Sequence, residues 1–117
     1  FRETLGTLDA ALFVTPEYNR SVPAVLKNAL DIGSRPYGAN MWDGMPAAIV
    51  SCSPGRLGGF GANHHLRQSL SCLNMPTLAQ PESYLSDIRQ QLEQSEDLKK
   101  RSATLIKEFI QLIERYE

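Results

Sequence analysis

Short apolar runs alternate with segments of helical periodicity along this chain. Two runs, residues 10–14 and 47–52, are almost continuously apolar or small and are bounded by turn residues. That pattern is typical of strands buried on both faces of a sheet. Pro16 lacks an amide donor and is expected to end the pairing of the first strand. A short third strand is predicted within residues 76–81.

The segments between these runs have the spacing of helices. After the first run, apolar residues recur on one helical face, namely Val22, Val25, Leu26, Ala29 and Leu30. Ser21 is the expected N-cap of this helix and Gly33 its expected C-terminal stop. A second helix is predicted over about residues 62–73, after a glycine-rich turn.

The two ends of the chain also have helical patterns. Residues 2–8 resemble the last turns of a helix, and residues 34–44 are rich in turn formers and predict a loop. From Asp87 onward the chain is highly charged and carries an apolar stripe at helical spacing. This pattern predicts an amphipathic closing helix with one solvated face.

Alternating strands and helices predict a single α/β domain over residues 1–117, with a parallel sheet and helices on both faces. The chain has 117 residues, of which 42% are hydrophobic, and a formal net charge of −1. This balance argues against a nucleic-acid or anionic-membrane binder, and no apolar run approaches the ~20 residues that span a bilayer. Two cysteines are too few for a disulfide framework, which favours a cytoplasmic setting.

In open parallel sheets, ligands bind outside the carboxyl ends of the strands. Two loops fit this rule, residues 15–21 (the first loop) and residues 51–61 (the second loop), and we expect them to lie side by side. The second loop offers many backbone N–H groups near a helix N-terminus, which suits anions and planar polar groups but is equally typical of a plain tight turn. Its glycines match neither a phosphate-binding P-loop nor a dinucleotide fingerprint.

The first loop has two interpretations. It is either a turn in which Asn19 or Ser21 caps the next helix, or a ligand clamp whose main-chain groups meet the edge of a heterocycle beside Tyr18. Other chemistry is disfavoured. His64 and His65 diverge by about 100° on a helix and cannot share a metal ion.

Nucleophilic and acid–base sites are also disfavoured. No G-x-S-x-G elbow surrounds Ser53, as a serine hydrolase would require, and Glu17 has no partner carboxylate at a recognisable spacing. Cys52 and Cys72 resemble buried small hydrophobic residues. No metal site and no catalytic side chain is therefore assigned.

The sequence TPEYNRSVP at 15–23, followed by LKNALD at 26–31 and by Ser34 and Arg35, resembles the signature of the NADPH-dependent FMN reductases. These are flavodoxin-like proteins that include bacterial quinone, chromate and azo-dye reductases. Ser53-Pro54-Gly55, Gly58-Gly59 and HLRQSL at 65–70 are similar to the same family. The likeness covers roughly residues 5–85, and Ile32 and Met45 depart from residues common there.

The resemblance implies a three-layer flavodoxin-like fold with a parallel sheet in the order 2-1-3-4-5. This chain would supply the third to fifth strands and would be the C-terminal part of an FMN-binding domain, with two strands and the phosphate loop preceding Phe1. The resemblance also implies the cofactor-binding residues. Those of the first loop would line the flavin ring and those of the second would approach it from the next strand: Pro16, Glu17, Tyr18, Asn19, Arg20, Ser53, Pro54 and Gly55.

By the same resemblance, the protein would use FMN and NADPH to pass a hydride to a quinone, azo or flavin acceptor. Candidate contacts for the NADPH phosphates are Arg20, Arg35 and Arg56. Relatives form dimers or tetramers, and candidate interface residues, which are not distinguished from core residues, are Tyr18, Tyr37, Trp42, Phe60 and His64. Two alternatives remain: a flavodoxin-like electron carrier, which is usually strongly acidic, and a non-catalytic FMN-binding module.

Overall fold

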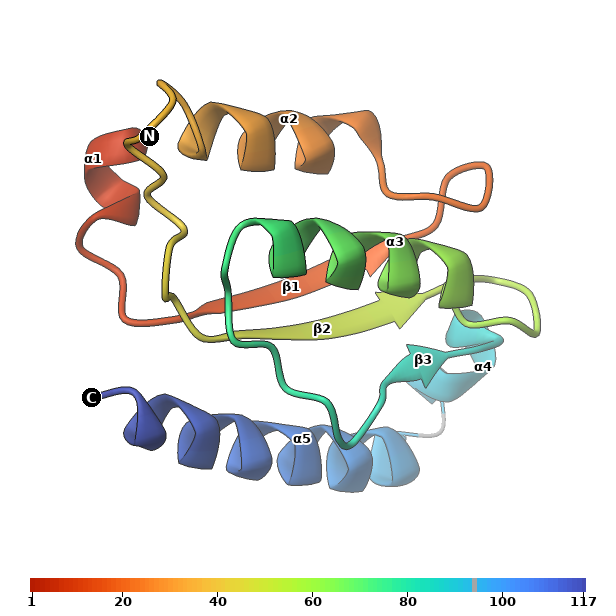
Figure 1. Ribbon diagram of the computed structural model, residues 1–117. Coiled ribbons are helices and arrows are strands. Elements are labelled where there is room, and N and C mark those ends of the chain that lie inside the picture. The colour runs from red at the N-terminus through yellow and green to blue at the C-terminus, as the bar shows by residue number, and fades with distance from the viewer. Residues whose placement is uncertain (94) are drawn as a thin grey trace.

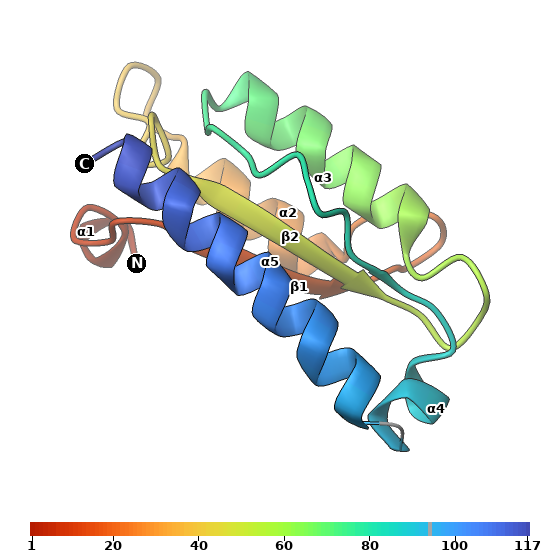
Figure 2. The same cartoon turned by 90° about the horizontal axis from the view of Figure 1, so that it is seen from below.

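Three parallel strands form the sheet of the computed structural model, which describes residues 1–93 and 95–117. Helices α2 and α3 cover one face of the sheet and α5 crosses the other (Figures 1 and 2). The elements are α1 (Arg2–Leu5), β1 (Ala11–Pro16), α2 (Ala24–Gly33), β2 (Ala47–Cys52), α3 (Phe60–Cys72), β3 (Tyr84–Leu85), α4 (Ile88–Glu93) and α5 (Ser95–Arg115). The predicted α/β class with a parallel sheet is confirmed. The order β1-β2-β3 agrees with the last three strands of the expected sheet.

The register of the sheet brings the ends of β1 and β2 together. The strands pair in parallel from Ala11 opposite Ala47 to Pro16 opposite Cys52. Strand β2 is in the middle and is buried along nearly its whole length, as its apolar run predicts. Both strands therefore end at the same edge of the sheet, and each is followed there by a loop.

The prediction that the first strand is buried on both faces is wrong. Leu12 and Val14 are 41% and 67% exposed. They line an apolar groove of about 400 Å³ between the sheet and α5. The core under α5 is built mainly on Ala48, Leu105 and Phe109, so the helix covers β2 rather than β1. An apolar run predicts that a strand favours burial, but it does not predict which neighbouring element covers each face.

The third strand is also displaced from its predicted position. Pairing with β2 begins near Thr77, which forms an isolated parallel bridge with Ala47, and resumes at β3. Between these points lies Pro81, which has no amide to donate to a ladder. The predicted strand over residues 76–81 is therefore reduced to a bridge, and the strand itself lies at Tyr84–Leu85.

Ser21 does not cap α2, contrary to the prediction. The N-cap position belongs to Pro23, which offers no side-chain hydrogen bond. Ser21 instead pairs through its backbone with Tyr18, and this closed turn holds it away from the helix start. The closing segment comprises two helices, α4 and α5, rather than one.

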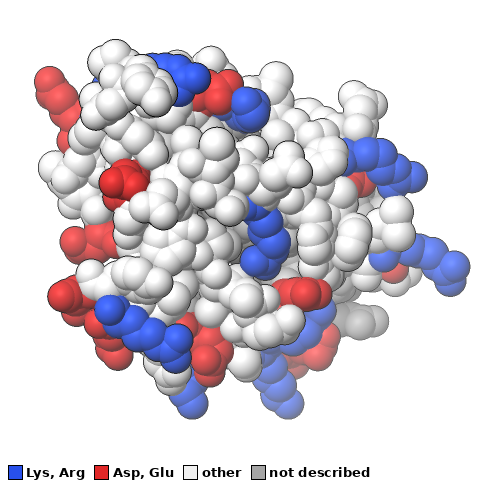
Figure 3. All heavy atoms as spheres, in the orientation of Figure 1, with Lys and Arg blue, Asp and Glu red and all other residues white. Residues whose placement is uncertain are grey.

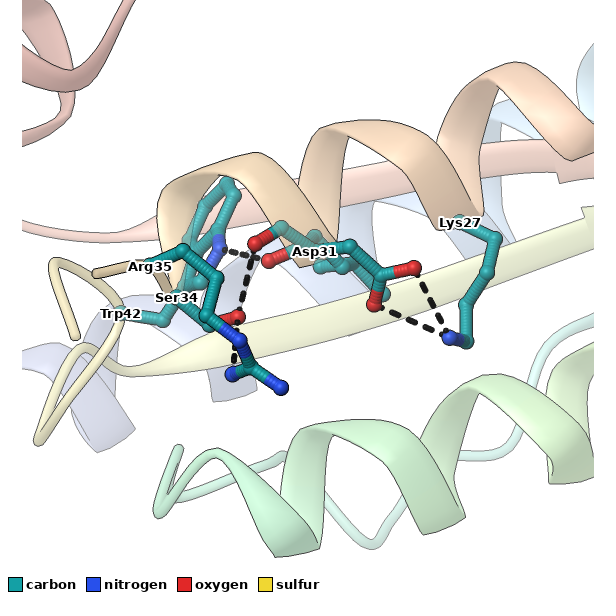
Figure 4. A network of polar contacts seen from close by, with 6 residues as sticks. Lys27, Asp31, Ser34, Arg35 and Trp42 are labelled. Atoms are coloured by element: carbon teal, nitrogen blue, oxygen red, sulfur yellow. Dashed lines mark hydrogen bonds and ion pairs between the residues drawn. The ribbon is translucent and has the colours of Figure 1, made fainter. Parts of the chain in front are cut away.

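The main core lies between the sheet and the pair α2 and α3. Trp42 is only 4% exposed and packs there with Leu30, Ile49, Leu66 and Leu70. Its indole Nε1 donates a hydrogen bond to the Leu30 carbonyl at 3.0 Å (Figure 4). Trp42 is thus a core residue and not an interface residue.

The surface carries both signs of charge. Acidic and basic side chains are interspersed on the face shown in Figure 3 and gather mainly along its lower edge. This mixture is consistent with the net charge of −1. Among the residues that the structure describes, no helix is both long enough and apolar enough to cross a bilayer.

Candidate functional site

The two loops singled out in the sequence lie side by side. Pro16 and Cys52, the last residues of β1 and β2, are direct partners in the parallel register. Each loop then leads into a helix on the same face of the sheet, the first into α2 and the second into α3 (Figure 1). The carboxyl edge of the sheet is therefore formed by both loops together, as the topology predicts.

The first loop is a tight turn with two left-handed residues. The amide of Tyr18 donates to the Ser21 carbonyl at 2.9 Å, and the amide of Ser21 donates to the Tyr18 carbonyl at 3.0 Å. Between them, Asn19 and Arg20 adopt φ angles of 52° and 68°. Their amides have no acceptor among the described residues. The turn thus leaves two donors, beside the exposed ring of Tyr18, free for a ligand.

The second loop turns on two glycines in the left-handed region. Gly58 and Gly59 have φ angles of 61° and 76°. The loop is tied to β3 because the Ser53 amide donates to the Leu85 carbonyl at 3.1 Å. The amides of Gly55 and Arg56, in contrast, have no acceptor in the described part of the chain. This loop therefore adds further free donors to the same edge.

A buried polar network fixes the second loop from below. The Ser51 hydroxyl donates to the Gly58 carbonyl at 2.8 Å and accepts from the Asn63 side-chain amide at 3.1 Å. Arg67 Nε donates to Asn63 Oδ1 at 2.9 Å. Ser51 and Asn63 are fully buried, and all their polar atoms are satisfied. Such a network rigidifies the loop that it supports.

Sequence reasoning missed this network, although one signal for it exists. Asn63 shares a helical face with Leu66 and Leu70, which are both core residues. A polar residue within an apolar helical stripe indicates a buried hydrogen bond, since an unsatisfied amide there would be costly.

An aromatic cluster stands beside the second loop. The rings of Phe60 and His64 have centroids 4.2 Å apart, and those of Phe60 and Tyr84 are 5.2 Å apart. His64 Nε2 and the Tyr84 hydroxyl lie 2.8 Å apart. Partial burial, and then the carboxylate of Glu82, raise the pKa of the Tyr84 phenol above its ordinary value. The phenol is therefore protonated at neutral pH and contributes a neutral, flat surface.

The three candidate arginines are not all brought to this edge. Arg20 lies in the first loop and is largely exposed, and Arg56 is exposed in the second loop. Arg35 follows the C-terminal end of α2, where its guanidinium donates to the Ser34 hydroxyl at 3.3 Å (Figure 4). The C-terminal end of α2 lies at the opposite end of the sheet from both loops (Figure 1), and Arg35 follows that end directly. The sequence could not show this, since Arg35 belongs to the same family-like motif as the first loop.

The two cysteines differ in their surroundings. Cys52 ends β2, is half-buried and lines the apolar groove, whereas Cys72 is exposed at the end of α3. The expectation of burial is therefore wrong for Cys72. Burial raises the pKa of the Cys52 thiol, which lowers its thiolate fraction.

We expect iodoacetamide to alkylate Cys72 at least about tenfold faster than Cys52 near neutral pH, because the thiolate is the reacting form, burial raises the pKa of the Cys52 thiol, and Cys72 is the more exposed of the two. Peptide mass spectrometry over a time course measures both rates. The Cys72→Ser variant should retain a single, slowly reacting thiol. Equal rates at the two positions would contradict the difference in environment.

Comparisons with known proteins place the chain in a family. A family model described as NADPH-dependent FMN reductase matches residues 1–90. The chain is 53% identical over 110 residues to a quinone reductase of Pseudomonas putida, with 94% of this chain and 59% of that protein covered. It is 40% identical over 114 residues to a 2-hydroxy-1,4-benzoquinone reductase of a Burkholderia species, with 93% of this chain and 62% of that protein covered.

A solved structure also matches. FerB, a flavoenzyme NAD(P)H:(acceptor) oxidoreductase from Paracoccus denitrificans, superimposes with a TM-score of 0.78 at 30% identity, covering 98% of this chain and 66% of that one. The chain thus spans about 59% to 66% of the length of these relatives.

Proposed function

The chain belongs to the NADPH-dependent FMN reductase family, and from that premise we propose that it forms the flavin-binding edge of an FMN-dependent NAD(P)H oxidoreductase. The proposed acceptor is a small molecule of quinone type, since the relatives named above include reductases of quinones. One observation carries the proposal: two adjacent loops at the carboxyl edge of a parallel sheet present main-chain N–H groups that have no acceptor in the described residues.

The donor set fits an isoalloxazine ring. The pyrimidine edge of that ring carries carbonyl oxygens and ring nitrogens, and amide donors complement such an edge. Asn19 and Arg20 supply donors from the first loop, and Gly55 and Arg56 supply them from the second. In the proposed site, main-chain groups of Pro16, Glu17, Tyr18, Asn19 and Arg20 line the ring, and Ser53, Pro54 and Gly55 approach it from the next strand.

The chemistry that a bound FMN supplies is the transfer of two electrons from NAD(P)H to the acceptor. The chain's own contribution is binding, orientation and electrostatics. Fixed amide dipoles favour negative charge on the pyrimidine edge and need no reorganisation to do so. The exposed guanidiniums of Arg20 and Arg56 are proposed contacts for the phosphates of NAD(P)H, whereas Arg35 lies too far from the loops for that role.

We also propose that the whole protein is a homo-oligomer in the cytoplasm. Large aromatic side chains stand exposed near the two loops, namely Tyr18 and Phe60, and such surfaces favour contacts with another subunit. Both cysteines are free thiols, which suits a reducing compartment.

Two measurements on the purified full-length protein test the proposed function. Titration with FMN should quench the flavin fluorescence with a Kd of about 1 μM or lower, equivalent to about −8 kcal/mol. Rapid mixing with NADPH or NADH should then bleach the flavin absorbance, and a quinone should restore it. Failure to bind FMN would exclude the flavin site. Binding without bleaching by either nucleotide would exclude the reductase and leave an electron carrier or a non-catalytic module.

A further inference from the structure

The side chain of Glu17 contacts the first turn of α3. Its side chain is only 9% exposed, and its Oε2 accepts a hydrogen bond from the Ala62 amide at 3.1 Å. Ala62 lies in the first turn of α3, 45 residues further along the chain. The carboxylate of the first loop thus reaches across to the helix that follows the second loop.

The start of α3 has no cap from its own segment. Its N-cap residue is Gly59, which has no side chain to accept a hydrogen bond. The first amides of a helix lack intrahelical partners, and a carboxylate near them is favoured by the helix dipole. Glu17 therefore does from a distant loop what an N-cap side chain ordinarily does locally.

Two further contacts join the same elements. A Cβ added at Gly61 would overlap the Arg20 carbonyl oxygen and come within 2.8 Å of Glu17 Oε2, so the loop lies directly against the helix backbone there. One turn later, His65 Nδ1 and the Ser21 hydroxyl lie 2.8 Å apart. The first loop is thus fastened to α3 at three successive places.

The ion pair on the other carboxylate oxygen contributes little to holding the Glu17 side chain in place. Glu17 Oε1 lies 3.5 Å from the guanidinium of Arg20, whose side chain is 74% exposed. Exposed pairs of this kind contribute little because solvent screens them. The half-buried, charge-assisted hydrogen bond from Ala62 is the stronger of the two interactions.

We propose that Glu17 is a positioning residue that holds the first loop against the start of α3. It thereby fixes the free amides of Asn19 and Arg20 relative to those of Gly55 and Arg56. We call the contacts of residues 17–21 with Gly61, Ala62 and His65 the clasp. The inference rests on the proposed flavin site, which it deepens: the carboxylate of Glu17 acts on FMN affinity through the loop geometry and not through contact with the ring or proton transfer. Gly61 is the complementary half of the clasp, since only a residue without Cβ allows the close approach.

Substitutions at Glu17 separate the hydrogen bond from the charge. Glu17→Ala removes both and should weaken FMN binding about tenfold to a hundredfold, the worth of one charge-assisted hydrogen bond. Glu17→Gln keeps an oxygen acceptor for Ala62 and should restore most of the affinity. Glu114→Gln, at an exposed position of α5, is the matched control and should change the FMN Kd less than about twofold.

Gly61→Ala gives an independent test of the same clasp. Alanine favours a helix over glycine, so helix propensity alone predicts a more stable protein. The clash with the first loop predicts instead an FMN Kd raised about tenfold. Leu70→Ala, in the core on the same helix, supplies a destabilised protein in which the loops are untouched. If its FMN Kd at a temperature where it is folded rises as much as that of Glu17→Ala, the effect is general destabilisation and the proposal fails.

Hydrogen exchange of the flavin-free protein makes the clasp testable apart from the flavin site. Glu17→Ala should speed exchange at the hydrogen-bonded amides of Ala62, Tyr18 and Ser21 at least about tenfold, while exchange in β2 stays as in the wild type. Unchanged exchange at these amides would overturn the clasp, whether or not FMN binds. Faster exchange in a protein that never binds FMN would retain the clasp but overturn the proposed function and the role of Glu17 in it.

Discussion

Replacing Gly58 with alanine should lower the free energy of unfolding by about 3 kcal/mol, near the top of the usual range for single substitutions. Gly58 has a φ of 61°, a conformation that costs an L-residue roughly 1–2 kcal/mol. A Cβ there would also lie 2.6 Å from the carbonyl carbon of Tyr84 and 2.9 Å from the Ser86 amide nitrogen. These are backbone atoms of β3 and its continuation, so they cannot move aside as a flexible side chain would.

Urea unfolding followed by circular dichroism measures this loss. Gly55→Ala is the matched control in the same loop, because a Cβ at Gly55 would have nothing within 4 Å, and its stability should change by less than about 0.5 kcal/mol. Equal stabilities for the two variants would show that the second loop does not press on β3 as the structure has it.

Trp42→Ala should cost about 3–5 kcal/mol, the usual loss when a large aromatic side chain is removed from a core. Trp42 is 4% exposed and packs against the ring of Phe13, with ring centroids 6.0 Å apart. The backbone of Gly33 also lies against the indole, because a Cβ added there would overlap it. The cavity left by alanine would open directly beneath α2, which carries the LKNALD segment (Figure 4).

The hydrogen bond of the indole can be measured separately. Trp42→Phe keeps most of the ring volume and removes the indole donor, while the Leu30 carbonyl keeps its hydrogen bond from the Ser34 amide at 3.1 Å. A loss of about 0.5–1.5 kcal/mol, the net worth of one hydrogen bond, is therefore expected. Unfolding in urea of both variants and the wild type gives the comparison. A loss below about 1 kcal/mol for Trp42→Ala would contradict the core position of this side chain.

The features that the sequence predicted correctly are those determined by local pattern and by chain topology. Apolar runs separated by helical segments are enough for a parallel sheet, because crossover connections between parallel strands need helices. That β1 and β2 end at the same edge of the sheet then follows from two neighbouring strands of equal direction. The adjacency of the two loops was predictable for the same reason, before any side-chain contact was known.

The features that the sequence did not predict depend on contacts between distant segments. The hydrogen bond from Ala62 to Glu17 joins positions 45 residues apart, and nothing in the spacing of either segment indicates it. Trp42 lies among turn residues, a position that suggests a surface aromatic side chain. Its burial depends on Gly33, because only a residue without Cβ leaves room for the indole ring. The exposed face of β1 likewise depends on the path of α5, which the apolar run of Leu12 and Val14 cannot specify.

In the first loop, a side chain has a structural role and main-chain amides are the groups left free for a ligand, which residue types alone do not show. A glutamate beside a tyrosine and an asparagine invites an acid–base interpretation, yet the Glu17 carboxylate is held by a helix amide. The free groups of this loop are main-chain amides of residues with positive φ. Main-chain groups are the same in every residue type except proline, so residue types say little about a site built from them. The motif at residues 15–23 therefore indicated a flavin site only through its resemblance to a known family.

The central claim is that both loops together hold one flavin through main-chain donors, and amide chemical shifts test it most directly. In a two-dimensional ¹H–¹⁵N spectrum of the labelled protein, added FMN should shift the amides of Asn19, Arg20, Gly55 and Arg56. The amides at the opposite end of the sheet, such as those of Ala11 and Ala47, should stay in place. Shifts confined to one loop, or absent from both, would contradict the claim.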